Sequence, residues 1–352
     1  MSSQDSVRRN IREMQGYVSG EQPDTAKFIK LNTNENPFPP SAKVVEAIRS
    51  AALGNLNVYP DALSSAFRIA ASEILQVEPT NILCGNGSDD ILTMLTRTFV
   101  DAGDWIRIPY PSYVLYRTLA AIQGAQTEEI HFNSDWSLPA EFARTDKNPS
   151  LVFLPNPNSP SGTAVPLEEI SKLAESLPCP LVVDEAYADF AETNSLELVR
   201  QHENLIVTRS LSKSYGLAGL RFGFAIASES IIAEMQKVKD SYNCDSLSIA
   251  GATAAIQDTD WLNENRQKII KLRSELDRDL VELGFHTVPS QANFIWCQHP
   301  NHPALSLYEQ LKRNHILVRY MDYPNWGDGL RISVGTANQN SALKTILGSI
   351  ID

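Results

Sequence analysis

The 352-residue sequence has few cysteines, and none of them belongs to a CxxC pair: Cys84, Cys179, Cys244 and Cys297. This scarcity excludes a disulfide framework and a zinc ribbon, both of which need closely spaced cysteines. We expect the four thiols to be reduced and mostly buried. Cys297 lies close to His299 and His302 in the sequence, but a structural zinc site normally has four ligands. We therefore predict no metal.

Long hydrophobic runs are also missing. The sequence holds no apolar stretch of about 18 residues, the length that a membrane span needs. The first residues, MSSQDSVRR, carry charge where a signal peptide has its apolar core. We therefore predict neither membrane insertion nor export, and expect a cytoplasmic protein.

Positive charge and histidine are in short supply as well. The chain has 30 Lys and Arg against 42 Asp and Glu, a net charge of -12, with no basic run that would bind nucleic acid. Nucleic acid is therefore not an expected partner. None of the six histidines belongs to an HExxH motif or has an evident nucleophile partner. This absence argues against a zinc hydrolase and a Ser-His-Asp enzyme.

What the sequence does contain, between residues 45 and 250, is an alternation of short apolar runs and amphipathic stretches of helical length. The expected strands are 81–84, 105–108, 151–154, 181–183, 205–208 and 222–227, and the expected helices are 90–100, 113–123 and 167–177. This alternation predicts an α/β fold, with a largely parallel sheet covered on both faces. Such sheets bind ligands beyond the carboxyl ends of their strands.

The pattern changes at the two ends of the chain. Residues 251–352 predict a smaller α+β domain, with helices at 260–284, 305–312 and from 338, and strands at 293–297, 316–320 and 330–334. Residues 1–44 form an N-terminal segment with one short helix whose apolar face holds Val7, Ile11 and Met14. So short a helix must dock on another surface to be stable. We expect residues 1–44 as a whole to pack with the small domain and a partner subunit, whereas the surface on which the helix itself docks stays open.

The most informative segment is 210–221, which reads SLSKSYGLAGLR. Ser210 and Ser212 supply hydroxyl donors just before Lys213, and the glycines allow close backbone approach. Arg221 can bind an anion with two hydrogen bonds. Lys213 can also act as an amine nucleophile. Taken alone, the segment fits an anion site and an ordinary polar loop equally well.

Asp184 lies at the end of an apolar run, 29 residues before Lys213. A carboxylate at the mouth of a buried strand is costly unless it has a cationic partner, and a pyridinium nitrogen is one such partner. The alternative is that Asp184 caps the next helix or pairs with an arginine. Tyr187 follows three residues later and can reach the same ligand, or can be a core tyrosine.

Several further candidates follow strands. Residues 83–90 read as a strand, a glycine turn and a helix start, so Ser88 and Asp89 lie at a helix N-terminus that can bind an anion or can simply be capped. Asn158 lies in a turn-rich loop as a possible hydrogen-bond donor, and Tyr113 can stack on a flat ring. Tyr59 is a further hydroxyl in a turn.

Arg319 and Arg331 each lie in an apolar strand near the C-terminus. Arginine in such a strand is either an edge residue or a partner for a carboxylate or phosphate.

Taken together and in order, these motifs resemble the fold-type I pyridoxal-phosphate enzymes, and among them the histidinol-phosphate aminotransferases. The resemblance covers nearly the whole chain and includes residues 16–20, GYVSG, and 30–38, KLNTNENPF. It implies an aspartate aminotransferase-like fold, and a homodimer in which Tyr59 reaches the partner's site.

For the cofactor, the resemblance implies that Lys213 forms the Schiff base with pyridoxal 5'-phosphate and moves the proton. Asp184 would keep the pyridine nitrogen protonated, so that the ring accepts electrons. The ring oxygen would be held by Tyr187 and Asn158, and Tyr113 would stack on the ring. The phosphate-binding residues would be Ser88, Asp89, Ser210, Ser212 and Arg221.

For the substrate, the resemblance implies Tyr17, Asn36, Arg319 and Arg331 as binding residues. Arg331 would hold the glutamate carboxylate and, with Arg319 and Tyr17, the phosphate of histidinol phosphate. The expected reaction exchanges an amino group between histidinol phosphate and 2-oxoglutarate.

Two rivals share the scaffold, an aromatic or broad-specificity aminotransferase and a decarboxylase of a phosphorylated amino acid. In one respect the chain departs from many relatives, because Ser159 replaces an asparagine and Ser161 a threonine.

Overall fold

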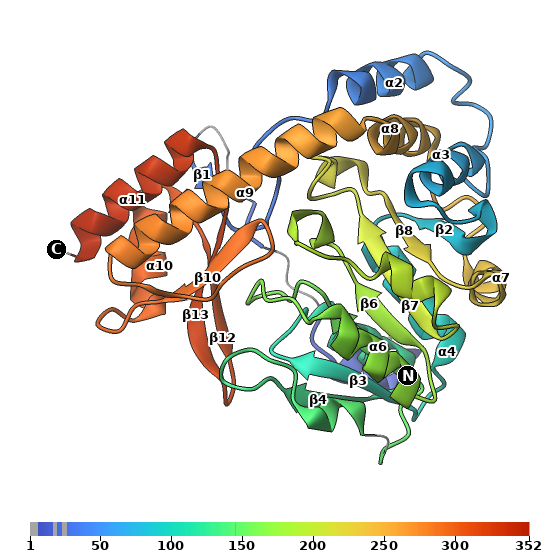
Figure 1. Cartoon of the computed structure of the whole chain (residues 1–352), viewed down its shortest axis with the longest axis horizontal. Coiled ribbons are helices and arrows are strands. Elements are labelled where there is room, and N and C mark those ends of the chain that lie inside the picture. The colour runs from blue at the N-terminus through green and yellow to red at the C-terminus, as the bar shows by residue number, and fades with distance from the viewer. Residues whose placement is uncertain (1–5, 17–19, 23–26, 145, 352) are drawn as a thin grey trace.

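We describe the fold from a computed structural model, which covers residues 6–16, 20–22, 27–144 and 146–351. A seven-stranded sheet with its helices forms one part of the molecule, the large body, and a four-stranded sheet with its helices forms the other, the small body. Figure 1 shows the long helix α9 (Thr259–Glu282) running from the large body to the small one.

The large sheet has the strand order β2-β8-β7-β6-β5-β3-β4, and all its strands except β8 run in one direction. The predicted α/β class with a largely parallel sheet is therefore confirmed. The strands are β2 (Ile82–Gly85), β3 (Trp105–Tyr110), β4 (Gln126–His131), β5 (Leu151–Pro155), β6 (Leu181–Asp184), β7 (Leu205–Ser210) and β8 (Gly223–Ile226).

Strand β4 is the one strand of this sheet that the apolar pattern misses. It is an edge strand of sequence QTEEIH, and its residues are exposed or only partly buried. Two of its carboxylates pair with arginines, Glu128 with Arg107 at 2.8 Å and Glu129 with Arg117. An edge strand needs no continuous apolar run, because one of its sides faces water.

Helices cover both faces of the large sheet, because alternate residues of each buried strand point to opposite faces. Leu154 and Val183 belong to one apolar cluster, whereas Phe153 and Val182 belong to the other. The covering helices are α2 (Ala42–Ala52), α3 (Ser65–Leu75), α4 (Ser88–Phe99), α5 (Leu115–Gln123), α6 (Leu167–Ser176), α7 (Glu229–Val238) and α8 (Ser246–Gln257). The expected domain boundary at 250/251 falls inside α8, which packs on α2 and α3.

The small body is built on an antiparallel sheet of order β12-β13-β10-β9, with a core of its own around Ile295, Leu330 and Leu343. Its elements are β9 (His286–Thr287), β10 (Phe294–Gln298), α10 (Ala304–Arg313), β11 (Ile316–Leu317), β12 (Arg319–Tyr323), β13 (Gly327–Ser333) and α11 (Ala337–Ile351). No helix in the described ranges combines the length and apolarity that a bilayer crossing requires.

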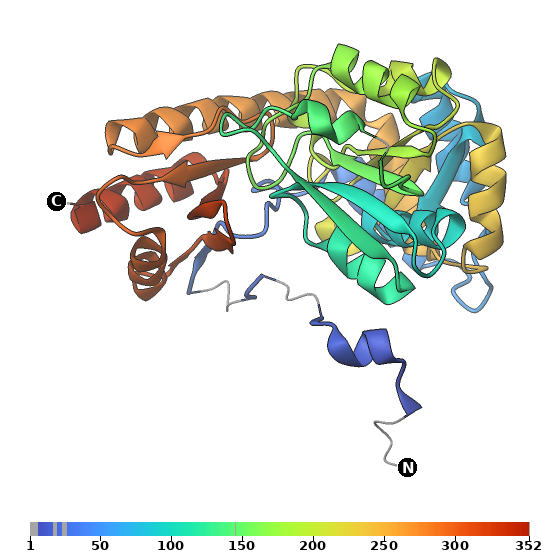
Figure 2. The same ribbon diagram turned by 90° about the horizontal axis from the view of Figure 1, so that it is seen from below.

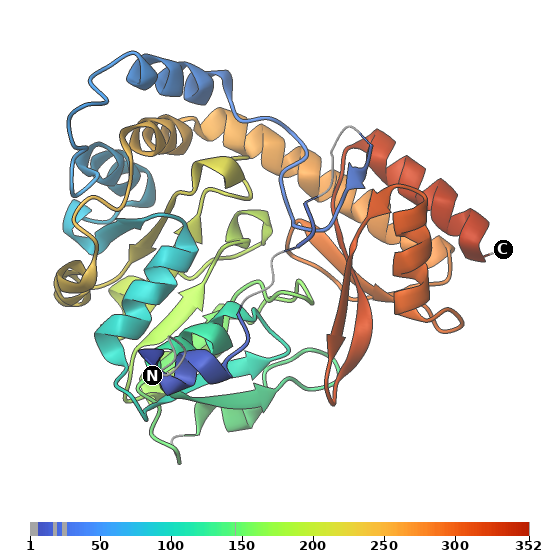
Figure 3. The ribbon, with the colours of Figure 1, turned by 180° about the vertical axis from the view of Figure 1, so that it is seen from behind.

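The N-terminal segment contacts both bodies. Strand β1 (Ile29–Lys30) pairs in parallel with β11 of the small body. Helix α1 (Arg9–Glu13) reaches the large body, where the Asn10 side chain donates a hydrogen bond of 2.8 Å to the Ala121 carbonyl of α5. Figure 2 shows α1 at the periphery of the molecule, and Figure 3 shows it in front of the large body. The described parts of the N-terminal segment therefore contact the large body through α1 and the small body through β1.

Candidate active site

The strand directions bring several predicted residues to one edge of the large sheet. Ser88 follows β2, Asp184 ends β6 and Ser210 ends β7, all at the carboxyl edge. Because β8 runs antiparallel, it begins at this edge, and its first residue Gly223 pairs with Ser210. Arg221, two residues before Gly223, is thereby placed beside the other three.

A cavity of about 340 Å³ lies between this edge, residues 32–35 of the N-terminal segment and the hairpin β12–β13. Its wall therefore combines three segments that are far apart in the sequence. The sequence-predicted residues on the wall are Ser88, Asp89, Tyr113, Asp184, Tyr187, Ser210, Ser212, Lys213, Arg221, Arg319 and Arg331.

Asp184 is the buried acid of the cavity, with 5% of its surface exposed. Its two carboxylate oxygens accept hydrogen bonds from the Tyr116 hydroxyl at 2.7 Å and from the Thr208 hydroxyl at 3.1 Å. Burial raises the pKa of this carboxyl to about 6, although both hydrogen bonds favour the charged form. A ligand that brings a protonated nitrogen to Asp184 would offset that desolvation.

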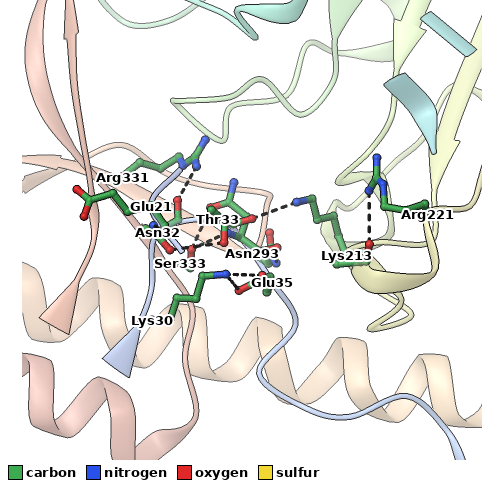
Figure 4. A network of polar contacts seen from close by, with 12 residues as sticks. Glu21, Lys30, Asn32, Thr33, Glu35, Lys213, Arg221, Asn293, Arg331 and Ser333 are labelled. Carbon is green, nitrogen blue, oxygen red and sulfur yellow. Dashed lines mark hydrogen bonds and ion pairs between the residues drawn. The ribbon is translucent and has the colours of Figure 1, made fainter. Parts of the chain in front are cut away.

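The Lys213 amine projects into the cavity from the loop after β7. Its Nζ donates a hydrogen bond of 3.2 Å to the Thr33 carbonyl, as Figure 4 shows, and lies 5.8 Å from the centre of the Tyr187 ring. The Tyr187 hydroxyl accepts a hydrogen bond of 3.0 Å from the Asn34 amide. Within the described ranges Lys213 has no carboxylate in ion-pair contact, so its amine is available to a ligand.

An anion cradle lies at the start of α4. The cap residue Gly87 supplies no side-chain cap, so the first N–H groups of the helix point free from Ser88 onward. A Cβ on Gly87, whose φ is +84°, would lie 2.6 Å from an Arg221 guanidinium nitrogen. The Arg221 guanidinium lies 3.4 Å from the Ser212 hydroxyl and 3.4 Å from the Asp89 carboxylate. A positive helix end, a guanidinium and a hydroxyl thus face one spot, which suits a phosphate.

Two arginines stand directly opposite each other on the small-body side of the cavity. Arg319 of β12 and Arg331 of β13 are register partners. The Arg331 guanidinium donates to two neutral acceptors, the Ser159 hydroxyl and the Asn32 carbonyl, each at 3.0 Å, and its Nε is buried without a hydrogen-bond partner. In the described part of the chain neither arginine pairs with a carboxylate. Like charges at such a position repel, so an anion between them is stabilising.

Two predicted residues lie behind the cavity wall instead of on it. The Asn158 amide donates to the Pro111 carbonyl at 3.3 Å and to the Ser161 hydroxyl at 2.9 Å, while its Oδ1 is buried without a partner. Its neighbour Ser159 lines the cavity. The Asn36 amide donates to the carbonyl oxygens of Lys213 and Ser214 at 2.9 and 3.0 Å. It therefore supports residues 211–217, the loop after β7 that carries Lys213 and is called the lysine loop below.

Tyr59 is not part of this cavity in the single chain. Tyr59 is 77% exposed and stacks on Tyr242, with 4.4 Å between ring centres. Its predicted contact in a partner subunit stays a prediction. Tyr17 lies outside the described residues.

The structure gives no support to a metal site made of Cys297, His299 and His302. That thiol is fully buried, and burial raises its pKa. His299 instead contacts the Leu283 carbonyl at 3.2 Å. Among the residues that are described, no group of three or more His, Cys, Asp or Glu side chains could hold a metal ion.

Comparisons with known proteins identify the family of this chain. Residues 26–347 match the family model described as "Aminotransferase class I and II". The chain belongs to this aminotransferase family. It is 56% identical to a histidinol-phosphate aminotransferase of Rhodopirellula baltica over 95% of this chain and 93% of the relative, and 44% identical to one of Geotalea daltonii over 98% of both.

A solved structure of similar fold is the histidinol-phosphate aminotransferase of Sinorhizobium meliloti in complex with pyridoxal-5'-phosphate. The TM-score is 0.92 at 27% sequence identity, covering 99% of this aminotransferase and 98% of the other chain. The predicted family resemblance is thus confirmed.

Sequence reasoning missed several side chains of this aminotransferase that contact the predicted ones. Tyr116 and Thr208 bind Asp184, Asn34 binds Tyr187, and Ser159 binds Arg331. Only Tyr116 has a sequence signal, because it lies three residues after Tyr113, and the two ring centres are 5.6 Å apart in the structure. The other contacts depend on how the bodies and loops pack.

Proposed function

We propose that this aminotransferase exchanges an amino group between L-histidinol phosphate and 2-oxoglutarate, with pyridoxal 5'-phosphate as its cofactor. The observation that carries the substrate part is the cross-strand pair Arg319 and Arg331, which has no acidic partner among the described residues. Both substrates are anionic, and one guanidinium geometry suits carboxylate and phosphate alike. The names of its relatives, histidinol-phosphate aminotransferases, support the same substrate.

The residues of the cavity fit the cofactor. The cradle at α4 with Arg221 and Ser212 suits its phosphate, and the buried Asp184 suits its ring nitrogen. Gly87 leaves room for the guanidinium that the phosphate needs. Tyr113, on the same wall, suits a ring face.

When bound, pyridoxal phosphate supplies an aldehyde that joins amines and a ring that withdraws electrons from the substrate carbon. The chain's own residues then do the rest. Asp184 would hold the proton at the ring nitrogen, because a buried carboxylate oriented by the Tyr116 and Thr208 hydroxyls stabilises a positive charge beside it. Lys213 would hold the cofactor through its amine, and as a general base it would move the proton at the substrate carbon. Tyr187, oriented by Asn34, holds the ring oxygen.

At the substrate end, Arg331 holds a carboxylate and Arg319 adds the second charge that a phosphate needs. The Thr33 and Asn32 carbonyls bring the N-terminal segment against Lys213 and Arg331, respectively. This segment therefore forms one wall of the cavity and restricts the access of water from that side.

We also propose a homodimer in which Tyr59 completes the partner's site. The residues near Tyr59 expose apolar side chains that a second subunit would cover: Leu53, Leu56, Val58 and Tyr242. Such a patch marks an interaction surface. A sedimentation measurement that finds a monomer at micromolar concentration would rule this arrangement out.

The central experiment is a spectrum followed by a substrate panel. Protein purified with added pyridoxal phosphate should absorb visible light, and the band should be altered by borohydride and missing in Lys213→Ala. A colourless wild type would contradict the cofactor. In the panel, histidinol phosphate should react faster with 2-oxoglutarate than phenylalanine, tyrosine or aspartate do. Faster phenylalanine turnover would favour the aromatic aminotransferase, and carbon dioxide release from a phosphorylated amino acid would favour the decarboxylase.

A further inference from the structure

A buried ion cluster lies behind the cavity wall, formed by Arg209, Glu185 and Asp189. The Arg209 guanidinium contacts the Glu185 carboxylate at 2.7 Å and the Asp189 carboxylate at 3.0 Å. The side chain of Glu185 is fully buried, and that of Arg209 is 11% exposed. The Ser214 hydroxyl donates a hydrogen bond to Asp189. None of these four side chains lines the cavity.

Each member of the cluster neighbours a residue that does line the cavity. Arg209 precedes Ser210, Glu185 follows Asp184, and Ser214 follows Lys213; Asp189 lies two residues after Tyr187. Arg209 and Ser210 are consecutive residues of strand β7, so their side chains point to opposite faces of the sheet. Glu185, Asp189 and Ser214 are joined to Arg209 directly or through Asp189 and, like Arg209, lie outside the cavity lining. The cluster is thus a second polar layer behind the segments that carry the site, and it connects them to one another.

Stability alone is a weak reason for such a cluster. Burying ionic groups costs desolvation that their attraction barely offsets, and apolar replacements often do as well. Burial raises the pKa of the Glu185 carboxyl even though the Arg209 guanidinium opposes that rise. The cluster does, however, fix directions in space, because a guanidinium with two carboxylate partners has a defined orientation.

The lysine loop is held from two sides. From the cluster side, Asp189 accepts the Ser214 hydroxyl. From the N-terminal segment, the Asn36 amide donates to the carbonyl oxygens of Lys213 and Ser214. Only the first of these contacts depends on Arg209, which orients Asp189.

We propose that Arg209 is a positioning residue, which through Asp189 and Ser214 fixes the backbone of Lys213 and so the direction of its amine in the cavity. This role rests on the proposed function for its effect on turnover, but its structural part concerns the chain alone. The reactive geometry tolerates little displacement, because a shift of about 1 Å can cost about 100-fold in rate.

The chain offers a matched control in a second buried ion pair. Arg107 is 1% exposed and contacts Glu128 at 2.8 Å and the Phe142 carbonyl at 2.8 Å. It lies on β3 of the same sheet, but neither it nor its partners line the cavity. Arg107→Lys therefore perturbs a buried arginine with a similar desolvation cost but makes no change at the lysine loop.

The first test is hydrogen exchange in the cofactor-free protein. Ser214→Ala leaves the ion cluster intact and removes only its link to the loop, so amides 211–217 should exchange about 5-fold faster, as one lost hydrogen bond predicts. Arg209→Lys should raise exchange in the same amides. Arg107→Lys should leave them unchanged and affect residues 140–144 instead. Unchanged exchange at 211–217 in both cluster variants, or an equal rise in Arg107→Lys, would overturn the proposal.

The second test uses the loaded enzyme. Ser214→Ala should lower kcat about 10-fold with KM within about 2-fold, because the amine is misdirected while the arginines still bind substrate. It should also shift the pH midpoint of the visible absorbance, which Arg107→Lys should not move. An unchanged midpoint and kcat in Ser214→Ala would reject the positioning role. If the wild type binds no pyridoxal phosphate, the proposed function fails, and hydrogen exchange still decides whether Arg209 orders the loop.

Discussion

The two sides of the cavity are built on different principles. On the large-body side, Asp184 is buried and receives two side-chain hydrogen bonds from Tyr116 and Thr208. On the small-body side, Arg319 and Arg331 face each other across a hairpin, and within the described residues Arg331 donates hydrogen bonds to neutral acceptors only. On the first side, hydrogen bonds already orient the charged group. On the second side, the two guanidinium groups have no acidic partner among the described residues and can bind an anionic ligand.

The supports of the two sides differ in the same way. The large-body residues lie at the ends of strands inside a seven-stranded sheet. The arginine hairpin instead touches the large body through aromatic rings, since Trp326 lies 4.8 Å from the ring of Trp136 and the Tyr110 hydroxyl donates to the Pro324 carbonyl. A rigid sheet edge suits a cofactor that stays bound, whereas a hairpin supported by aromatic contacts suits substrates that bind and dissociate. The difference predicts which substitutions damage chemistry and which damage binding.

The largest effect should come from the buried acid. Asp184→Asn keeps the shape but loses the charge that holds a proton at the ring nitrogen, so kcat should fall about 1,000-fold, in the range of a lost electrostatic stabiliser. Substrate KM should change little, because the arginines are intact. Steady-state kinetics with histidinol phosphate give both values. A large rise in KM with an unchanged kcat would show that Asp184 acts on the substrate side.

Asp184 should also make the stability of the cofactor-free protein depend on pH. The folded pKa of Asp184 is about 6, above its ordinary value of 3.8, so the folded state holds more protons than the unfolded state between these values. Stability from this group is full below about pH 4 and is lost as the pH rises through 6, by about 3 kcal/mol. Urea unfolding at several pH values should show this loss in wild type and not in Asp184→Asn.

Asp258 provides the control for that measurement. Its side chain is 8% exposed and contacts Lys43 at 2.7 Å, which lowers its pKa below the ordinary value. Its contribution is therefore lost only as the pH falls through that lower value. Asp258→Asn should leave the wild-type slope between pH 4 and 6 intact. If the slope disappeared in both variants, the titration of Asp184 would not be its cause.

On the other side of the cavity, Arg319→Ala should separate the two substrates. Loss of a charged hydrogen bond to phosphate should weaken histidinol phosphate by about 2 kcal/mol, with a much smaller effect on glutamate. The measurement is kcat/KM for each half-reaction, together with the visible spectrum, which should stay as in wild type. Equal losses on both substrates would mean that Arg319 does not select phosphate.

The sequence could predict the residues whose place is fixed by the direction of a strand, and not those whose place depends on the path of a loop. Asp184, Lys213 and Arg221 were found because each follows or precedes an apolar strand, and strand direction alone brings such residues to one edge. Asn158 and Ser159 could not be ranked, because the path of the turn decides which side chain faces the cavity. The contact of Thr33 with Lys213 depends on the docking of an N-terminal segment with almost no periodicity of its own.

The smallest effect should come from the aromatic support of the hairpin. Trp326→Leu removes ring contacts with Trp136 and His131 while keeping an apolar side chain, so the arginines should lose some of their alignment. An aromatic pair contributes about 1 kcal/mol, which predicts a KM rise of about 5-fold with kcat nearly unchanged. Because the sheet edge is untouched, the spectrum and its pH midpoint should match wild type. If instead kcat fell and KM held, the hairpin would position the reacting groups as firmly as the sheet does, and the contrast between the two sides would be lost.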